Sequence, residues 1–149
     1  MRGVKPMRRY AASLALVLVL LAGCGQQSPQ ETLRSELQAV KSNTAIVEMV
    51  ARNLARGAVP QAYAGNAIEA AKGNLDGSIQ ALSELPEVKG NGAQPGGLLP
   101  RLQAVQRDTE GLLDVVKKGD LSNLTPLAEQ LAKEEQAIDE IVKGMGIEL

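Results

Sequence analysis

Apolar side chains recur at alternating spacings of four and three residues along four stretches of this 149-residue chain. The first stretch shows the pattern at Leu33, Leu37, Val40, Thr44, Val47, Ala51 and Leu54. Positions three and four residues apart lie on one face of an α-helix, whereas a β-strand repeats every two residues. The pattern returns over 64–85, 98–116 and 127–145, and no stretch with the period of a strand competes with it. The spacing predicts an all-α fold of four helices that each bury one face.

Residues that start or stop helices stand at the ends of these stretches. Ser28, Pro29 and Glu31 match a capping box with proline in the first turn. Thr125 and Pro126 give the last helix an N-cap and a first residue. Helix-ending residues follow the first three stretches at Gly57, Pro86 and Gly119, and Gly144 stands near the end of the last. We expect helices at residues 29–56, 60–85, 98–118 and 126–143.

The connections between the helices differ in length. The first and the third are short, which favours antiparallel packing of the helices that they join. Between them, residues 87–97 are rich in Gly, Asn, Pro and Gln and form the one flexible linker. Alternating spacings of three and four also favour helices that cross at about 20°. Together these features predict that residues 28–149 form an antiparallel up-down four-helix bundle with an aliphatic core.

The composition excludes several classes of function. The chain has no His, Trp or Phe and one Cys, so it lacks the usual acid/base catalyst, the usual zinc ligand and a base for a nucleophilic Ser or Cys. The first 23 residues hold four of the 16 basic residues and none of the 17 acidic ones, which leaves 12 basic against 17 acidic residues, a net charge of −5. An acidic surface disfavours nucleic acid as a partner. We therefore expect no catalytic residues, no metal site, no cofactor and no nucleic acid.

The first 24 residues have the features of an export signal. A basic segment at 1–9 precedes an apolar run of 11 residues, Ala11 to Leu21, which is shorter than the roughly 20 residues of a membrane-spanning helix. The run leads into Leu21-Ala22-Gly23-Cys24. This segment resembles the lipobox at the end of a bacterial lipoprotein signal peptide, whereas residues 28–149 resemble no family.

The resemblance implies cleavage of residues 1–23 and attachment of fatty acyl chains, such as palmitate, to Cys24. Residues 24–27 are then a lipidated tether, and the membrane is a partner through Cys24. The residue after Cys24 is Gly25 rather than aspartate. In this respect the chain resembles the lipoproteins that double-membrane bacteria send to the outer membrane. The alternative is an ordinary secretory signal cut after Ala22 or Gly23, which leaves a free thiol. The expected location is extracytoplasmic, in the cell envelope or periplasm, and anchored to a bacterial membrane.

Three polar residues fall on apolar positions of the predicted helices: Thr44, Thr109 and Glu134. Thr109 and Glu134 lie about 12 to 14 Å from the turn that joins the last two helices, so we expect them at the same level and within hydrogen-bonding distance. Three interpretations are open. Glu134 lies at a helix edge with its carboxylate in water, the three residues form a polar layer that fixes the register of the helices, or Glu134 is a catalytic acid.

The two short turns are expected at the same end of the bundle, away from Cys24. They bring together Val59, Tyr63, Leu121 and Leu124. Tyr63 is the one aromatic residue after the leader, and tyrosine is enriched at binding hot spots. Two interpretations are open: this end contacts a partner protein, or Tyr63 plugs the end of the core.

Three further features have alternative interpretations. A second stripe on the first helix, with Ile46 and Met49, either widens the buried face or contacts a partner. Gly73 and Gly77 face outward on the second helix, where they are either tolerated or let another backbone approach closely. A group of carboxylates on the last helix forms either a solvated face or a cation site. Its members are Glu134, Glu135, Asp139 and Glu140.

These features favour a non-enzymatic, membrane-anchored extracytoplasmic lipoprotein that binds or supports another component of the cell envelope. Its expected partners are the membrane and an envelope protein. The alternative is a sensory module that binds a small ligand or a cation in a groove between the helical hairpins.

Overall fold

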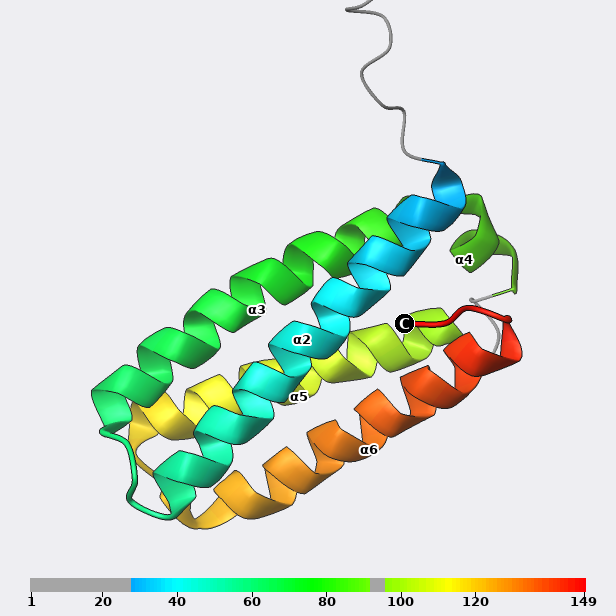
Figure 1. The fold of residues 1–149 in the computed structure, drawn as a ribbon. Coiled ribbons are helices and arrows are strands. Elements are labelled where there is room, and N and C mark those ends of the chain that lie inside the picture. The colour runs from blue at the N-terminus through cyan, green and yellow to red at the C-terminus, as the bar shows by residue number, and fades with distance from the viewer. Residues whose placement is uncertain (1–27, 92–95) are drawn as a thin grey trace, which may run out of the picture.

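The computed structural model describes residues 28–91 and 96–149. The expected leader at 1–23 and the tether with Cys24 lie outside these residues. The described chain is all-helical, without a β-strand, which confirms the predicted class. Its elements, shown in Figure 1, are α2 (Pro29–Ala55), α3 (Gln61–Glu84), α4 (Pro86–Asn91), α5 (Leu98–Lys118), the 3₁₀-helical turn η1 (Leu121–Asn123) and α6 (Leu124–Gly144).

The ends of α2 and α5 follow from the residues that stand there. The Ser28 side-chain oxygen accepts a hydrogen bond from the Glu31 backbone N–H at 3.2 Å, and the Glu31 carboxylate accepts one from the Ser28 N–H at 3.0 Å. The capping box is therefore confirmed. Gly57 after α2 and Gly119 after α5 take φ values of 69° and 75°. These left-handed conformations favour glycine and stop each helix close to its predicted end.

Both ends of α6 differ from the prediction. Thr125 does not cap it, because Asp120 accepts hydrogen bonds from the backbone and side chain of Ser122 and holds the turn η1, which runs directly into α6 at Leu124. Gly144 remains helical. The helix stops through Gly146, whose φ is 74°, and the following Ile147 N–H donates to the Val142 carbonyl at 3.2 Å. This Schellman-type ending turns residues 145–149 back toward the helices.

Part of the expected linker is helical. Leu85 is extended, with ψ at 134°, as expected for a residue before proline. Pro86 then begins α4 rather than only ending α3, since proline suits the first position of a helix. Val88 is buried and packs into the core, which attaches α4 to the long helices. The prediction of one flexible linker over 87–97 is therefore wrong for its first part.

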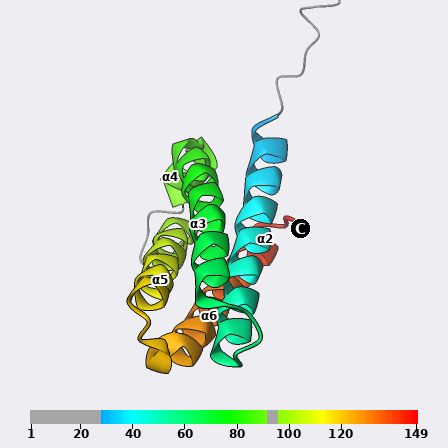
Figure 2. The same ribbon diagram turned by 90° about the vertical axis from the view of Figure 1, so that its left-hand side faces the viewer.

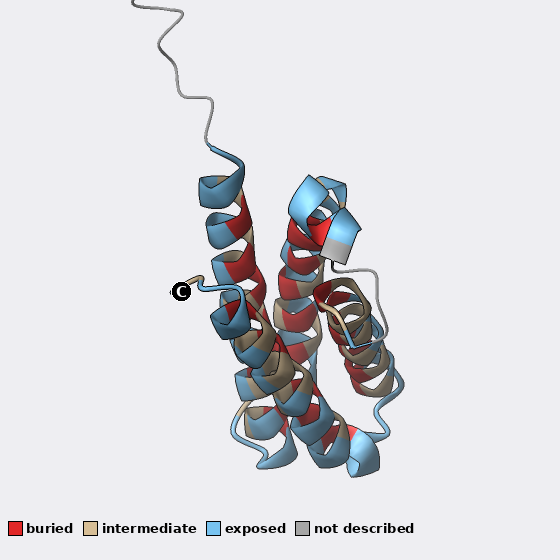
Figure 3. Ribbon diagram, turned by 90° about the vertical axis from the view of Figure 1, so that its right-hand side faces the viewer, coloured by how far each residue is buried: buried red, intermediate tan, exposed pale blue. Residues whose placement is uncertain are grey.

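The four long helices surround one aliphatic core. α2 contacts α3 and α6, and α5 contacts the same two helices, an order that Figures 1 and 2 both show. Figure 3 shows buried residues on the inner side of each long helix and exposed residues on the outer side. Fully buried large side chains occur along the whole length, among them Leu37, Ile68, Leu75, Leu82, Leu102, Leu112 and Leu131. None of the described helices is long and apolar enough to cross a membrane.

Candidate functional site

The turns after α2 and α5 lie at the same end of the molecule, at the lower left of Figure 1. We call this end the tip; it comprises residues 56–63 and 116–123. The Gln61 side-chain amide donates a hydrogen bond to the Val116 carbonyl at 2.6 Å, and Lys117 and Glu69 form an ion pair at 3.1 Å. The two turns are thus side by side, as the sequence predicts.

The four residues predicted to meet at the tip differ in their exposure to solvent. Tyr63 is 59% exposed, and Leu121 is also exposed. Val59 is half-buried against the core, and Leu124 is fully buried as the first residue of α6. Leu124 is therefore no contact residue, because its side chain belongs to the core. The interpretation of Tyr63 as a plug is also wrong, since the neighbouring Ala64 fills the buried position.

The outer stripe of α2 is open to solvent. Ile46 is 41% exposed and Met49 is 56% exposed. The stripe therefore does not widen the buried face, and both side chains are free to meet a partner. The described part of the chain covers neither of them.

Gly73 and Gly77 stand on the exposed side of α3. A Cβ atom built at either position meets nothing within 4 Å, so no neighbour in the described chain requires glycine there. Glycine inside a helix costs about 1 kcal/mol relative to alanine. The two glycines therefore weaken α3 without a contact among the described residues that requires them.

The polar layer, one of the three interpretations left open for Thr44, Thr109 and Glu134, is not joined by hydrogen bonds among these residues. Thr44 and Thr109 are buried, and neither hydroxyl has a hydrogen-bond partner among the described residues. Glu134 instead forms an ion pair with Arg101, with its oxygens 3.0 and 3.2 Å from one guanidinium nitrogen. The expected hydrogen bond between Thr109 and Glu134 is absent. The sequence did not predict Arg101 as the partner of Glu134, because Arg101 lies outside the apolar pattern and that pattern does not show how far a side chain reaches toward α6.

Asp108, at the contact between α5 and α6, has a carboxylate with only one of its two oxygens hydrogen-bonded. One of its oxygens accepts a hydrogen bond from Gln130 at 2.9 Å, and the other is buried without a partner among the described residues. Burial raises the pKa of Asp108, the Gln130 hydrogen bond lowers it, and the charge of Glu134 raises it. This carboxylate favours its protonated form more than an exposed aspartate does.

The carboxylates of α6 do not converge on one point. Glu134 faces Arg101, whereas Asp139 forms an ion pair with Lys41 of α2 at 2.7 Å. Within the described ranges, no three Cys, His, Asp or Glu side chains are placed to hold a metal ion. Glu135 is half-buried on α6, and this burial raises its pKa above the ordinary 4.5 of a glutamate. The charges of Glu48 and Asp139 raise this pKa further, and Lys41 lowers it.

This shift predicts a pH dependence of stability. Because the folded protein binds the Glu135 proton more tightly than the unfolded chain, stability falls as the pH rises above 4.5 through the raised pKa. Glu135→Gln is expected to raise the free energy of unfolding at neutral pH and to lose that advantage at pH values below 4.5. Urea unfolding at both pH values measures the effect.

The matched control is Glu129→Gln, which changes an exposed carboxylate on the same helix. It is expected to shift stability by a similar small amount at both pH values. An equal shift at both pH values for Glu135→Gln would contradict the assigned environment of this side chain.

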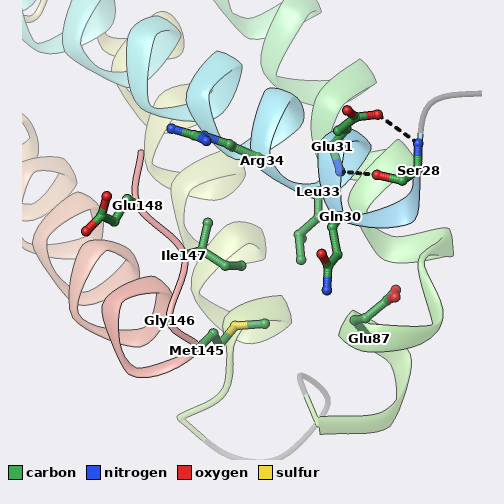
Figure 4. Close-up of a pocket in the computed structure, with 10 residues that line it drawn as sticks. All are labelled: Ser28, Gln30, Glu31, Leu33, Arg34, Glu87, Met145, Gly146, Ile147 and Glu148. Carbon is green, nitrogen blue, oxygen red and sulfur yellow. Dashed lines mark hydrogen bonds between the residues drawn. The ribbon is translucent and has the colours of Figure 1, made fainter.

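A groove lies at the opposite end, which we call the base: the start of α2, α4 and residues 145–149. Its volume is about 540 Å³. Figure 4 shows Leu33 and Gln30 of α2 on one side of the groove, Ile147 of the returning C-terminal segment across from them, and Glu87 of α4 beyond Gln30. The alternative function left open by the sequence places a ligand groove between the helical hairpins, whereas this groove lies at the base. The apolar spacing does not predict it, because it does not show that the chain turns back after α6.

Comparison with known proteins gives no match to a family model, to a curated protein or to a solved structure. The chemistry of the tip, the base and the helix surfaces is therefore the basis for assigning a function.

Proposed function

We propose that this protein is a non-enzymatic lipoprotein, anchored by Cys24 to a bacterial membrane on its extracytoplasmic side, that binds or supports another protein of the cell envelope. In this proposal residues 28–149 act as an antiparallel up-down four-helix bundle. The observation on which it rests most is the exposure of Tyr63 at the tip, 59% of its surface, in a chain whose core is aliphatic.

The position of the lipobox supports an orientation. Three residues separate Cys24 from Ser28, where the capping box begins α2. An extended tether of that length reaches about 14 Å, so the base stays near the membrane. The 27 residues of α2 span about 40 Å. The tip therefore stands well away from the lipid, where another envelope protein can reach it.

The environment of the polar side chains supports a non-enzymatic role. Thr44 and Thr109 are enclosed in the core, and Glu134 is held by Arg101. A nucleophile or general acid needs access to substrate and a second group that exchanges its proton. Neither threonine has that access, and the Glu134 carboxylate is occupied by an ion pair.

Tyr63→Ala tests the contact at the tip. A hot-spot tyrosine contributes about 2 kcal/mol or more, so we expect roughly a 30-fold weaker capture of the envelope partner. Capture from envelope extracts by the full-length protein, with quantification of the bound protein, measures the loss. Because Tyr63 is exposed, the melting temperature is expected to stay close to that of the wild type.

Met145→Ala serves as the control, since Met145 is an exposed apolar residue at the base. It is expected to leave capture unchanged. If Tyr63→Ala captures the partner as well as the wild type, or loses as much stability as binding, the tip is not the contact surface.

The groove at the base favours a second candidate function, the binding of a small ligand. Its apolar residues Leu33, Met145 and Ile147 lie beside the carboxylates of Glu87 and Glu148. A ligand that binds only the folded protein raises the melting temperature. A rise caused by the small-molecule fraction of envelope extracts, without a captured protein, would favour this function over the first.

A further inference from the structure

The two helix pairs differ sharply in surface charge. Five of the 23 exposed residues of α2 and α3 are charged, against nine of the 15 exposed residues of α5 and α6. Two charged residues of α2 and α3 reach neighbouring helices at the sides, Lys41 to Asp139 of α6 and Glu69 to Lys117 of α5.

Two further ion pairs lie within single helices, Arg52 with Glu48 in α2 and Lys72 with Asp76 in α3. Along the middle of α2 and α3 the outer surface between these sides carries no exposed charged residue, and the exposed Glu31 and Glu84 stand nearer the base.

We call this surface the uncharged wall. Its exposed residues are Ser42, Ile46 and Met49 of α2 and Ala70, Gly73, Asn74 and Gly77 of α3. Apart from the adjacent Gly73 and Asn74, the members on each helix are three, four or seven residues apart, so they lie on one side of that helix. The Asn74 side chain donates a hydrogen bond to the Asn43 side chain across the seam at 3.3 Å, which joins the two halves.

The wall combines exposed apolar side chains with unexplained glycines. Ile46 and Met49 lie on the α2 half. On the α3 half, a Cβ atom at Gly73 or Gly77 would meet no atom of the described chain within 4 Å, so no close contact there accounts for the glycines. A surface without side chains in the middle of a helix lets a second backbone come close. Both halves thus fit an interface with another protein surface.

The absence of charge on the middle of the uncharged wall indicates which partner surface can pack against it. In a two-fold pair each surface meets itself, so every residue near the axis faces its own copy. A charged residue there faces its like, which is unfavourable. The outer face of α5 and α6, with Arg107, Glu110 and Glu129 exposed, would suffer this repulsion, whereas the uncharged wall would not.

We propose that two copies of this chain pair side by side through the uncharged wall, with both α2 helices starting at the same end. The parallel orientation rests on the proposed membrane anchor, because two copies held by Cys24 in one membrane stand in the same direction. The uncharged wall runs along the helices, so two parallel copies can pack their walls together along their length without tilting. Confinement to one membrane raises their effective concentration.

Cysteine crosslinking in the full-length protein tests the pair. Ser42→Cys and Met49→Cys are each expressed alone, and membranes are treated with a short bifunctional maleimide. We expect covalent dimers from both variants, at least tenfold above the unsubstituted chain. The two positions are seven residues apart, about 10 Å along α2. A parallel pair puts each cysteine level with its own copy, whereas an antiparallel pair puts at least one of them about 10 Å or more along the helix from its copy, so equal yields at both positions favour parallel copies.

Matched controls are Gln103→Cys and Gln136→Cys, which place an exposed cysteine on α5 and α6. Crosslinking of the wall variants at the level of these controls would overturn the pair. Crosslinking at only one wall position would overturn the parallel arrangement. A product whose mass differs from twice that of the chain would put another protein on the wall and also overturn the proposal.

The glycines give a second readout. The double variant that combines Gly73→Ala and Gly77→Ala is expected to have a higher melting temperature than the wild type, because alanine favours the helix more than glycine does. In the Met49→Cys background the same changes are expected to lower dimer yield at least threefold, since added Cβ atoms hold the two backbones apart. An unchanged yield would overturn the close contact at α3. Membrane fractionation of the same samples tests the anchor separately: a released protein that still crosslinks contradicts the proposed function and leaves the pair standing.

Discussion

Cys24→Ser is expected to release the protein from the membrane fraction. The thioether that joins a diacylglycerol to the lipobox cysteine needs sulfur, so serine leaves the chain without acyl chains. Each buried methylene contributes about 0.8 kcal/mol, and two or three chains together hold a protein stably. Their loss is therefore expected to shift nearly all of the protein out of the membrane fraction, which fractionation and immunoblotting measure.

The control for this experiment is Gln26→Ser, which changes the tether and leaves Cys24 in place. It is expected to stay with the membrane. A cleaved Cys24→Ser protein that still fractionates with membranes would contradict lipid anchoring. Labelling of the mature wild-type chain by a thiol reagent would instead support the ordinary secretory signal, since an acylated cysteine has no free thiol.

Leu75→Ala is expected to lower the free energy of unfolding by about 2 to 5 kcal/mol. Leu75 is fully buried near the middle of α3, in a core of Leu, Ile, Val and Ala. A domain of this size has only about 5 to 15 kcal/mol of stability, so this one change removes a large part of it. With a single cysteine, the chain has no internal disulfide to compensate. Urea unfolding followed by circular dichroism measures the loss.

Leu121→Ala removes the same atoms from an exposed position in η1. It is expected to change stability by less than about 0.5 kcal/mol. A similar loss for both variants would mean that Leu75 does not lie in a closely packed core.

The long helices could be predicted because two independent signals agree in the sequence. The apolar spacing indicates which residues face inward, and the residues at the ends indicate where α2 begins and where α2 and α5 stop. The capping box at Ser28 and the left-handed glycines at 57 and 119 are examples. α4 lacked the first signal, because a helix of six residues shows too little periodicity. It depends on the burial of Val88, which only the tertiary structure decides.

The candidate sites were harder to predict because they depend on side-chain reach between helices. The spacing put Glu134 level with Thr109, but it did not show that the longer Arg101 side chain reaches the carboxylate first. The same limit applies at the tip. Tyr63 and Leu124 both stand at the start of a helix, yet one is exposed and the other buried. The difference comes from how the first turn of each helix is rotated against its neighbours.

The placement of Tyr63 also decides what optical spectroscopy can detect in this protein. After removal of the leader the chain contains one tyrosine and no tryptophan or phenylalanine. All its intrinsic ultraviolet fluorescence then comes from the tip, while the aliphatic core emits none. Loosening of the core leaves that emission nearly unchanged, whereas a molecule that settles on the tip alters it. The protein therefore carries its own fluorescent probe for association at the end farthest from the proposed anchor.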